Sequence, residues 1–233
     1  MVRCNSQPID VQSRRGRVLL GAFLSGLLFA TVARAEDADY LRTITQRAEK
    51  IVADLHITDT GRSNRVHGLL VQQYRDLNEI HSARDAEIAA AKTKFTDDKS
   101  GANSAVESAR TAAKARTDKL HGEFLARLST ELSPEQVDQV KDGMTYNVAP
   151  LRYADYLKMF PDLKPEEKRQ IKLWLVEARE IAMDGSTSNE KHAVFGKYKG
   201  RINNYLSRAG YDLKQGEANL RKPAPSNPET KSK

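Results

Sequence analysis

The sequence of 233 residues holds a single cysteine, Cys4, and few aromatic residues, which make up 6% of the chain. Cys4 lies in the segment 1–35, which we expect to be removed on export, so the remaining chain has no thiol. The absence of thiols excludes disulfide bonds, a cysteine nucleophile, iron–sulfur clusters and cysteine-ligated zinc. A hydrophobic fraction of 39% is still sufficient for a folded core.

The common catalytic and nucleotide-binding motifs are also absent. The sequence has no GxSxG, no P-loop, no dinucleotide-binding glycine pattern and no HExxH. No two of its five histidines lie three or four residues apart, so no helix offers a ready pair of metal ligands: His56, His67, His81, His121 and His192. We therefore expect no metal site, no cofactor and no catalytic residue that the sequence alone can assign.

The net charge of +7 does not indicate a nucleic-acid-binding protein. Segment 1–35 holds five arginines against one aspartate, and segment 221–233 holds four basic residues against one glutamate. Residues 36–220 therefore carry 29 basic and 29 acidic side chains. Because phosphate backbones require a concentrated basic face, this neutral body predicts no nucleic-acid partner.

Residues 1–35 have the features of a secretory signal peptide. Three arginines at positions 14, 15 and 17 precede the apolar run 18–32, VLLGAFLSGLLFATV, and the small residues Ala33 and Ala35 follow. This pattern predicts export to the periplasm or the exterior, with cleavage before Glu36. The run is short for a membrane span, which leaves no span after cleavage; a retained anchor and, from Arg14-Arg15, a twin-arginine route stay open as alternatives.

Apolar residues at helical spacing predict a fold built only of helices, with one domain over 36–215. We expect a long antiparallel hairpin over 60–131, made of helices 60–95 and 103–131 around a polar loop. Its tip is rich in alanine and alternating charge and has almost no large apolar residue, so it should project, weakly packed, from the body. This hairpin is our candidate surface for a protein client or for a second copy of the chain.

The second half, 132–215, is predicted to be compact and rich in aromatic residues. Ser133-Pro134-Glu135-Gln136, Lys164-Pro165-Glu166-Glu167 and Thr187-Ser188-Asn189-Glu190 each look like a helix start. Gly210 is expected to end the last helix. From residue 216 the sequence is polar and contains three prolines, which predicts a disordered tail over 216–233.

The aromatic residues supply the candidate binding site. Nine of the 13 aromatic residues outside segment 1–35 lie between residues 146 and 211, among basic and amide side chains. Flat rings with polar edges and forked donors suit a carbohydrate, although helix packing explains them as well. The candidate ligand-binding residues are Tyr146, Trp174, His192, Lys199, Arg201 and Asn203.

Gly196 and Gly200 lie four residues apart in the densest part of this segment. Glycine weakens a helix relative to alanine, so two on one face indicate that a neighbouring backbone, ring or ligand comes close. We expect tight packing against another helix.

Several stretches resemble a secreted bacterial family, domain of unknown function 3826. The similar residues are Leu132–Val137, Val140–Tyr146, Glu177–Asp184, Lys191–Leu206 and Ala209–Leu213. The resemblance is detailed over about 130–213 and looser over about 40–130. That family carries a sugar-binding description without established catalytic residues, so the resemblance implies an exported all-helical protein with a role in glycan binding.

These observations leave three functions open. The first is an exported, non-catalytic carbohydrate-binding or carbohydrate-utilisation accessory protein. The second is a periplasmic helical chaperone or stress adaptor, since Leu132-Ser133-Pro134-Glu135-Gln136 resembles the Leu-Thr-x-x-Gln motifs of such proteins. The third is a glycan hydrolase or lyase that uses carboxylates such as Asp142, Glu177 or Asp184 with His192 or Lys199; a carboxylate pair is defined by distance in space, which the sequence does not give.

Overall fold

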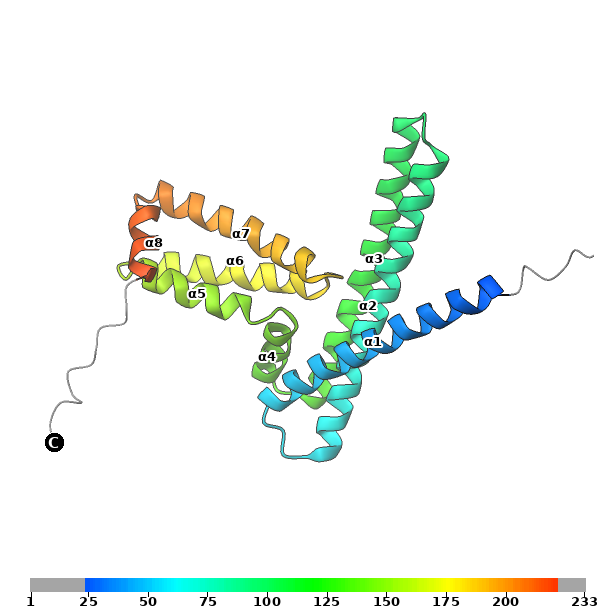
Figure 1. Cartoon of the computed structure of the whole chain (residues 1–233). Helices are drawn as coiled ribbons and strands as arrows, with labels where there is room; N and C mark the ends of the chain where they lie inside the picture. Colours follow the sequence, from blue (N-terminus) through cyan, green and yellow to red (C-terminus); the bar gives the residue numbers. More distant parts are fainter. Residues whose placement is uncertain (1–23, 222–233) are drawn as a thin grey trace, which may run out of the picture. The chain divides into compact units, whose positions relative to one another are not determined.

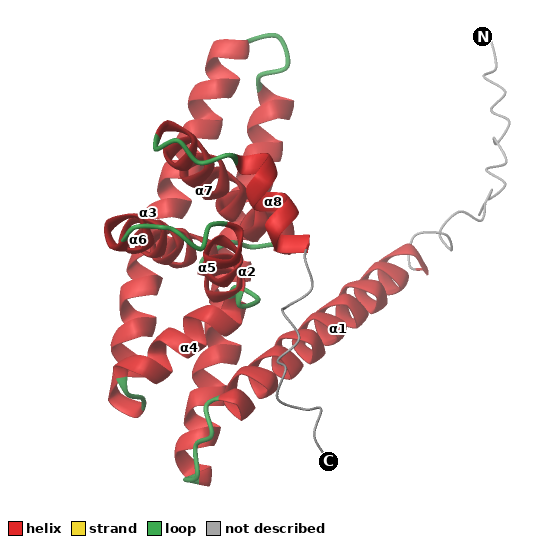
Figure 2. Cartoon of the chain, turned by 90° about the vertical axis from the view of Figure 1, so that its left-hand side faces the viewer, coloured by secondary structure: helices red, strands yellow, loops and turns green. Residues whose placement is uncertain are grey.

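The computed structural model describes residues 24–221, with side chains from residue 38 onward, and this part of the chain consists of eight α-helices and no strand (Figures 1 and 2). The chain divides into two units, Met1–Thr43 and Ile44–Lys233, and the candidate site belongs entirely to the second. The all-helical prediction is confirmed. No helix of the described residues is both long and apolar enough to cross a membrane.

The predicted signal peptide falls largely outside the described residues, because residues 1–23 are not among them. Helix α1, Leu24–Asp54, continues through the expected cleavage position between Ala35 and Glu36. In the second unit its buried side chains recur at helical spacing: Ile44, Ala48, Ile51 and Val52, followed by Leu55 beyond the helix end.

Helices α2, Thr60–Lys94, and α3, Lys99–Glu131, form the predicted hairpin and lie antiparallel (Figure 1). Asp59 caps α2 by accepting a hydrogen bond from the Arg62 backbone N–H at 2.6 Å, and Asp98 caps α3 through Gly101 N–H at 2.9 Å. The loop is therefore shorter than predicted, and the second helix starts at Lys99 instead of 103. A carboxylate cap allows the polar residues 99–102 to begin a helix.

The hairpin is well packed near its base and thin toward its tip. Large apolar side chains are buried only in the half next to the other helices: Val66, Leu70, Tyr74, Leu77, Ile80, Phe124 and Leu128. Nearer the tip than Ile80, the buried residues of the described chain are His81 and the alanines Ala91, Ala109 and Ala113. Each fully buried Leu or Ile contributes about 1.5–3 kcal/mol, so the base stabilises the hairpin far more than the tip.

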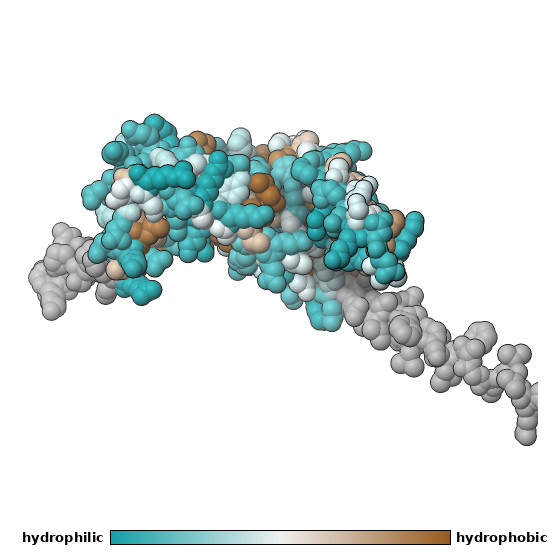
Figure 3. All heavy atoms as spheres, turned by 90° about the horizontal axis from the view of Figure 1, so that it is seen from above, coloured by the Kyte–Doolittle hydropathy of each residue, from teal (hydrophilic) through white to brown (hydrophobic). Residues whose placement is uncertain are grey.

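The remaining helices follow as α4, Pro134–Met144; α5, Val148–Met159; α6, Pro165–Met183; α7, Ser188–Arg208; and α8, Leu213–Arg221. Helices α5, α6 and α7 share one core, with α8 against α5. Its buried residues include Tyr156, Ile171, Leu175, Ala178, Phe195, Ile202 and Leu206. Figure 3 shows a mostly hydrophilic surface from above, where apolar residues form only small separate patches.

The predicted helix starts are confirmed in detail. Ser133 and Gln136 form a reciprocal capping box at α4, and the Glu167 side chain accepts from the Lys164 backbone N–H at 2.8 Å at α6. Thr187 caps α7 through Glu190 N–H at 3.1 Å, but the Glu190 carboxylate bonds Ser186 N–H instead of the Thr187 backbone. This second bond ties the turn before α7 to the helix itself.

Gly210 ends α7 as predicted. Its φ of +93° belongs to the left-handed region, and Tyr211 N–H bonds the Leu206 carbonyl at 3.1 Å while Gly210 N–H bonds that of Ser207. This pair of bonds turns the chain sharply toward α8.

Helix α8 corrects the predicted boundary of the disordered tail. Residues 216–221 are helical, and residues 222–233 lie outside the described part of the chain. Asp212 starts the helix by accepting from Lys214 N–H at 2.8 Å. Gly216 is buried because the Phe160 ring lies where a β-carbon would stand, only 2.5 Å from that position. The polar composition of this segment predicted disorder, because it does not reveal the close contact between Gly216 and Phe160 that holds α8 against α5.

Candidate functional site

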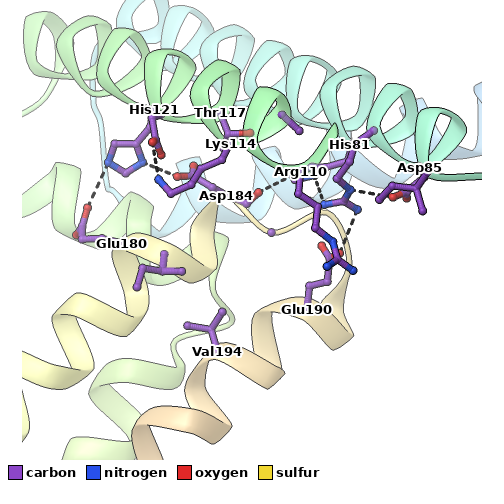
Figure 4. A pocket seen from close by; sticks show the side chains of 16 residues that line it. His81, Asp85, Arg110, Lys114, Thr117, His121, Glu180, Asp184, Glu190 and Val194 are labelled. Carbon is purple, nitrogen blue, oxygen red and sulfur yellow. Dashed lines mark hydrogen bonds and ion pairs between the residues drawn. The ribbon is translucent and has the colours of Figure 1, made fainter. Parts of the chain in front are cut away.

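A cleft of about 890 Å³ lies between the hairpin and the junction of α6 with α7 (Figure 4). We call it the hairpin cleft. One wall comes from α2 and α3, and the other from the end of α6, the turn at Gly185 and the first turns of α7. Its lining residues are His81, Arg84, Asp85, Ile88, Arg110, Ala113, Lys114, Thr117, Asp118, His121, Glu180, Ile181, Asp184, Gly185, Glu190 and Val194.

Helical spacing explains why these hairpin residues share one wall. On α2 the lining residues follow at steps of three and four from His81 to Ile88, and on α3 the same steps run from Arg110 to His121. The antiparallel arrangement then places His81 and His121, 40 positions apart in sequence, on either side of Asp184 (Figure 4).

Asp184, the C-cap residue of α6, connects both histidines. His81 Nε2 lies 2.8 Å from the Asp184 backbone oxygen, and His121 Nδ1 lies 2.8 Å from its carboxylate Oδ2. Two helices of the hairpin therefore hold the end of α6 through one residue. The other carboxylate oxygen, Oδ1, is buried and has no hydrogen-bond partner among the described residues, which costs about 1–3 kcal/mol unless a water molecule serves it.

The partners of His81 fix its tautomer. Arg84 donates from Nη1 to His81 Nδ1 at 2.9 Å, and a guanidinium can only donate. Nδ1 must therefore be unprotonated, so that Nε2 carries the proton and donates to Asp184. Arg84 is itself held by carboxylates, Asp85 at 2.8 Å and Glu190 at 3.3 Å.

His121 lies between two carboxylates. Its hydrogen bond with Asp184 raises the pKa of the imidazole, and Glu180, 3.7 Å from Nε2, acts in the same direction, although partial burial opposes both. The imidazole is thus poised to carry a proton on the cleft side of α3, while Asp184 sets its orientation.

Two cations, Lys141 and Arg179, form ion pairs with Glu180. Lys141 of α4 lies 3.0 Å from Glu180, and buried Arg179 contacts Asp138 at 2.6 Å, Asp142 at 3.1 Å and Glu180 at 3.3 Å. Burial raises the pKa of the Asp142 carboxyl, although Arg179 opposes this. The network fixes the α6 carboxylates relative to α4.

Lys191, on the first turn of α7, is a buried cation next to this network. Its Nζ donates to the backbone oxygens of Met144 at 3.0 Å and Met183 at 3.2 Å, and lies 5.9 Å from the Tyr74 ring centre. Burial lowers its pKa from 10.5 to about 8. Lys191 therefore joins the ends of α4 and α6 beside the cleft.

The hairpin cleft offers both hydrogen-bond donors and acceptors, with aliphatic groups between them. Ile181 is 50% exposed in the wall, and Ile88, Ala113 and Val194 also line it. The lining holds no Phe, Tyr or Trp side chain. Within residues 38–221, no three His, Asp or Glu side chains are placed to hold a metal ion.

The six residues predicted from the sequence lie in three separate places, none of which lines the hairpin cleft. Tyr146 and His192 form a stacked pair with ring centres 5.8 Å apart. Tyr146 and Asn147 both have positive φ, 58° and 56°, which is rare for residues other than glycine. This turn after α4 therefore holds the exposed Tyr146 ring in a strained backbone conformation.

Trp174 of α6 and Arg201 of α7 form the second group. The Arg201 guanidinium lies 4.6 Å from the Trp174 ring centre and 5.9 Å from that of Tyr198, and it approaches Glu177 at 3.4 Å. Trp174 is half-buried and meets the Tyr205 ring edge-on at 5.3 Å. The arginine already occupies the face that a sugar ring would need.

Lys199 and Asn203 form the third group, at a small pocket beside α8. Asn203 Oδ1 accepts a hydrogen bond from the Tyr156 hydroxyl at 2.8 Å. The expectation for Gly196 and Gly200 is wrong, because a β-carbon at either position would meet no atom of the described chain within 4 Å. Both glycines face open space and not a packed helix.

Sequence reasoning therefore missed His81, His121 and Glu180 as members of the site and included Asp184 only in the hydrolase alternative. The two histidines are isolated from each other along the sequence, and only the packing of the hairpin against the end of α6 brings both into contact with Asp184. No local pattern in the sequence marks that packing.

Comparison with known families matches residues 41–224 to the description "Protein of unknown function (DUF3826)". No curated protein matches the chain.

Proposed function

Because the chain belongs to the DUF3826 family, whose description assigns no activity, we propose a function from the cleft itself: an exported, non-catalytic protein that binds a neutral saccharide. The proposed binding site is the hairpin cleft, instead of the aromatic residues first singled out. The observation that carries the proposal is the combination of both hydrogen-bonding polarities with an exposed aliphatic wall in one cavity of saccharide size.

The volume of the cleft suits a small ligand. About 890 Å³ lies within the range of roughly 300–1,000 Å³ that is usual for small-molecule sites. Residues of four helices line this space, so a bound molecule would contact both the hairpin and the α6–α7 junction. Contacts with several helices at once allow many weak interactions to add.

The charges of the lining favour a neutral ligand that is rich in hydroxyl groups. The cations Arg84 and Lys114 are already paired with lining carboxylates, Asp85 and Asp118. Paired ions do not attract a further net charge, yet their remaining lone pairs and N–H groups can bond hydroxyl groups. A strongly anionic ligand would meet the carboxylates of Glu180, Asp184 and Glu190 in the same space.

Aliphatic side chains would serve the C–H faces of a sugar ring. Ile181 of α6 lines the cleft together with the charged groups, and so does Val194 of α7, which is labelled in Figure 4. Burial of apolar area contributes about 25 cal/mol per Å². Ile181 would therefore provide the apolar contact with the sugar ring that an aromatic side chain provides in other saccharide sites.

The test is a calorimetric titration of the full chain with neutral oligosaccharides. Two variants change exposed lining residues without disturbing the core, Ile181→Asp and Lys114→Gln. Each has a matched control outside the cleft, Leu173→Asp on the same helix, where the leucine is 63% exposed, and Lys119→Gln on α3. We expect saturable binding that Ile181→Asp weakens about tenfold or more and Lys114→Gln weakens less, while both controls bind as the wild type.

The outcome separates the three functions. Release of product during the titration would establish a hydrolase or lyase. No saccharide binding together with suppression of client aggregation would favour the chaperone. Equal loss of binding in a variant and its control would exclude the hairpin cleft as the site.

A further inference from the structure

A second, smaller pocket of about 230 Å³ lies where α5, α7 and α8 meet, and we call it the α8 pocket. Its volume is below the usual range for drug-sized ligands, so an occupant must be small. The pocket shares no lining residue with the hairpin cleft.

Helical spacing shows that the pocket is formed by three faces. On α5 the lining residues are spaced from Arg152 to Met159 at steps of three and four, and on α7 Lys199 and Asn203 are four apart. On α8, Leu220 and Arg221 follow Glu217 at three and four positions. Each helix therefore brings one basic side chain to the same space.

These three cations differ from the arginines around the hairpin cleft. Arg84 and Arg179 bind two and three carboxylates respectively, whereas Arg152, Lys199 and Arg221 form no ion pair within the described chain. Asp155 and Glu217 also line the pocket, but neither forms an ion pair with these cations in the described chain. The lining therefore carries three cations against two carboxylates, an excess of one positive charge.

Neutral hydrogen-bond donors in the α8 pocket also favour an anionic ligand. The Tyr156 hydroxyl donates to Asn203 Oδ1, so the Asn203 amide keeps its two N–H groups for another acceptor. Burial raises the pKa of Tyr156 to about 12, which keeps the hydroxyl protonated. Met159 and Leu220 provide an apolar side, and a reduced local dielectric strengthens each charge interaction.

We infer that the α8 pocket binds the anionic group of a small ligand, a phosphate, sulfate or carboxylate. Arg152 and Arg221 would form forked hydrogen bonds with its oxygens, and Lys199 would add a point charge. The group can belong to a free inorganic anion or to an acidic monosaccharide. This inference does not depend on saccharide binding in the hairpin cleft.

The test uses the full chain with four probes: sodium phosphate, sodium sulfate, sodium glucuronate and glucose. Backbone amide NMR shifts locate each probe, and titration gives its affinity. We expect saturable shifts around residues 152, 199 and 221 with the anions and none there with glucose. Binding of all three anions indicates a simple anion site, and binding of glucuronate alone indicates an acidic sugar.

Charge variants make the test specific. Lys199→Gln and Arg152→Gln should each weaken anion binding about tenfold, and Lys199→Arg should keep it. Lys197→Gln, an exposed lysine on the same helix outside the pocket, and Ile181→Asp in the hairpin cleft should both bind anions as the wild type. No saturable anion binding, equal weakening by Lys197→Gln, or equal binding of glucose would overturn the inference.

Discussion

Lys191 shows how a single side chain can stabilise two helix ends. It is only 4% exposed, and a buried cation is normally costly unless it is well compensated. Here Nζ meets the carbonyls of Met144 and Met183, the last residues of α4 and α6, where the helix dipoles favour positive charge. The lowered pKa indicates that this compensation is incomplete.

The pKa of Lys191 predicts that stability rises at alkaline pH. The unfolded lysine keeps its proton up to about 10.5, whereas the folded one loses it near 8. Between these values the unfolded state binds more protons, so the free energy of unfolding should increase with pH, by up to about 3 kcal/mol. Denaturant titrations from pH 7 to 10 measure this increase.

The variant Lys191→Met should lack the alkaline increase, and exposed Lys197→Met should retain it. The measurement ends at pH 10 because Tyr211, whose hydrogen bond to Glu167 raises its pKa to about 12, and buried Tyr156 act in the opposite direction above that value. An unchanged slope in Lys191→Met would show that other groups cause the increase.

At the residue scale, the sequence predicted which residues cap helices, but it did not predict which side chains from different helices contact each other. Ser133, Thr187 and Gly210 act through neighbours within a few positions, so local patterns are sufficient for them. Lys191 acts through Met144, 47 positions away, and His121 through Asp184, 63 positions away. Such partners depend on how helices pack, which no spacing within one segment gives.

At the scale of the helices, the glycines of α7 and α8 have opposite surroundings. Gly196 and Gly200 face open space, whereas Gly216 allows the Phe160 ring to touch the helix backbone. Both kinds lie in helices, so composition and spacing alone do not separate them. The predicted roles were the reverse: packing for the α7 pair and disorder from residue 216.

Alanine substitutions at these positions should therefore change stability in opposite directions. Gly196→Ala should raise the free energy of unfolding by about 0.5–1 kcal/mol, because alanine favours the helix and meets no neighbour. Gly216→Ala should lower it, since the new methyl group would stand 2.5 Å from Phe160 and α8 or the ring must move. Thermal and denaturant unfolding measure both; stabilisation by Gly216→Ala would show that α8 is not docked as described.

At the scale of the second unit, the hairpin and the C-terminal helices are joined through Asp184. His81 and His121 come from different hairpin helices, and Glu180 and Lys141 extend the contact to α4. The all-helical class and the long hairpin followed from apolar periodicity, because each helix carries its own pattern. The hairpin cleft could not be predicted from this periodicity, because its walls come from helices that are far apart in the sequence.

The raised pKa of His121 gives this junction a pH dependence. The folded state holds the imidazole proton to higher pH than the unfolded chain, whose histidine titrates near 6.5. The stabilisation is therefore fully present below pH 6.5 and is lost as pH rises through the folded pKa. Between pH 6 and 8, the wild type should lose more stability than His121→Gln, while His192→Gln, on the exposed stacked pair, should follow the wild type; parallel profiles for all three would contradict the role of His121.

The thin distal part of the hairpin, beyond the last large buried side chains, has a consequence for how this architecture can vary. Its helices meet mainly through alanine, and seven residues make nearly two whole turns. Addition of seven residues to each helix, placed between the cleft and the tip loop, would keep the same faces in contact. The hairpin can thus lengthen in steps of about 10 Å while the residues that line the hairpin cleft stay as they are.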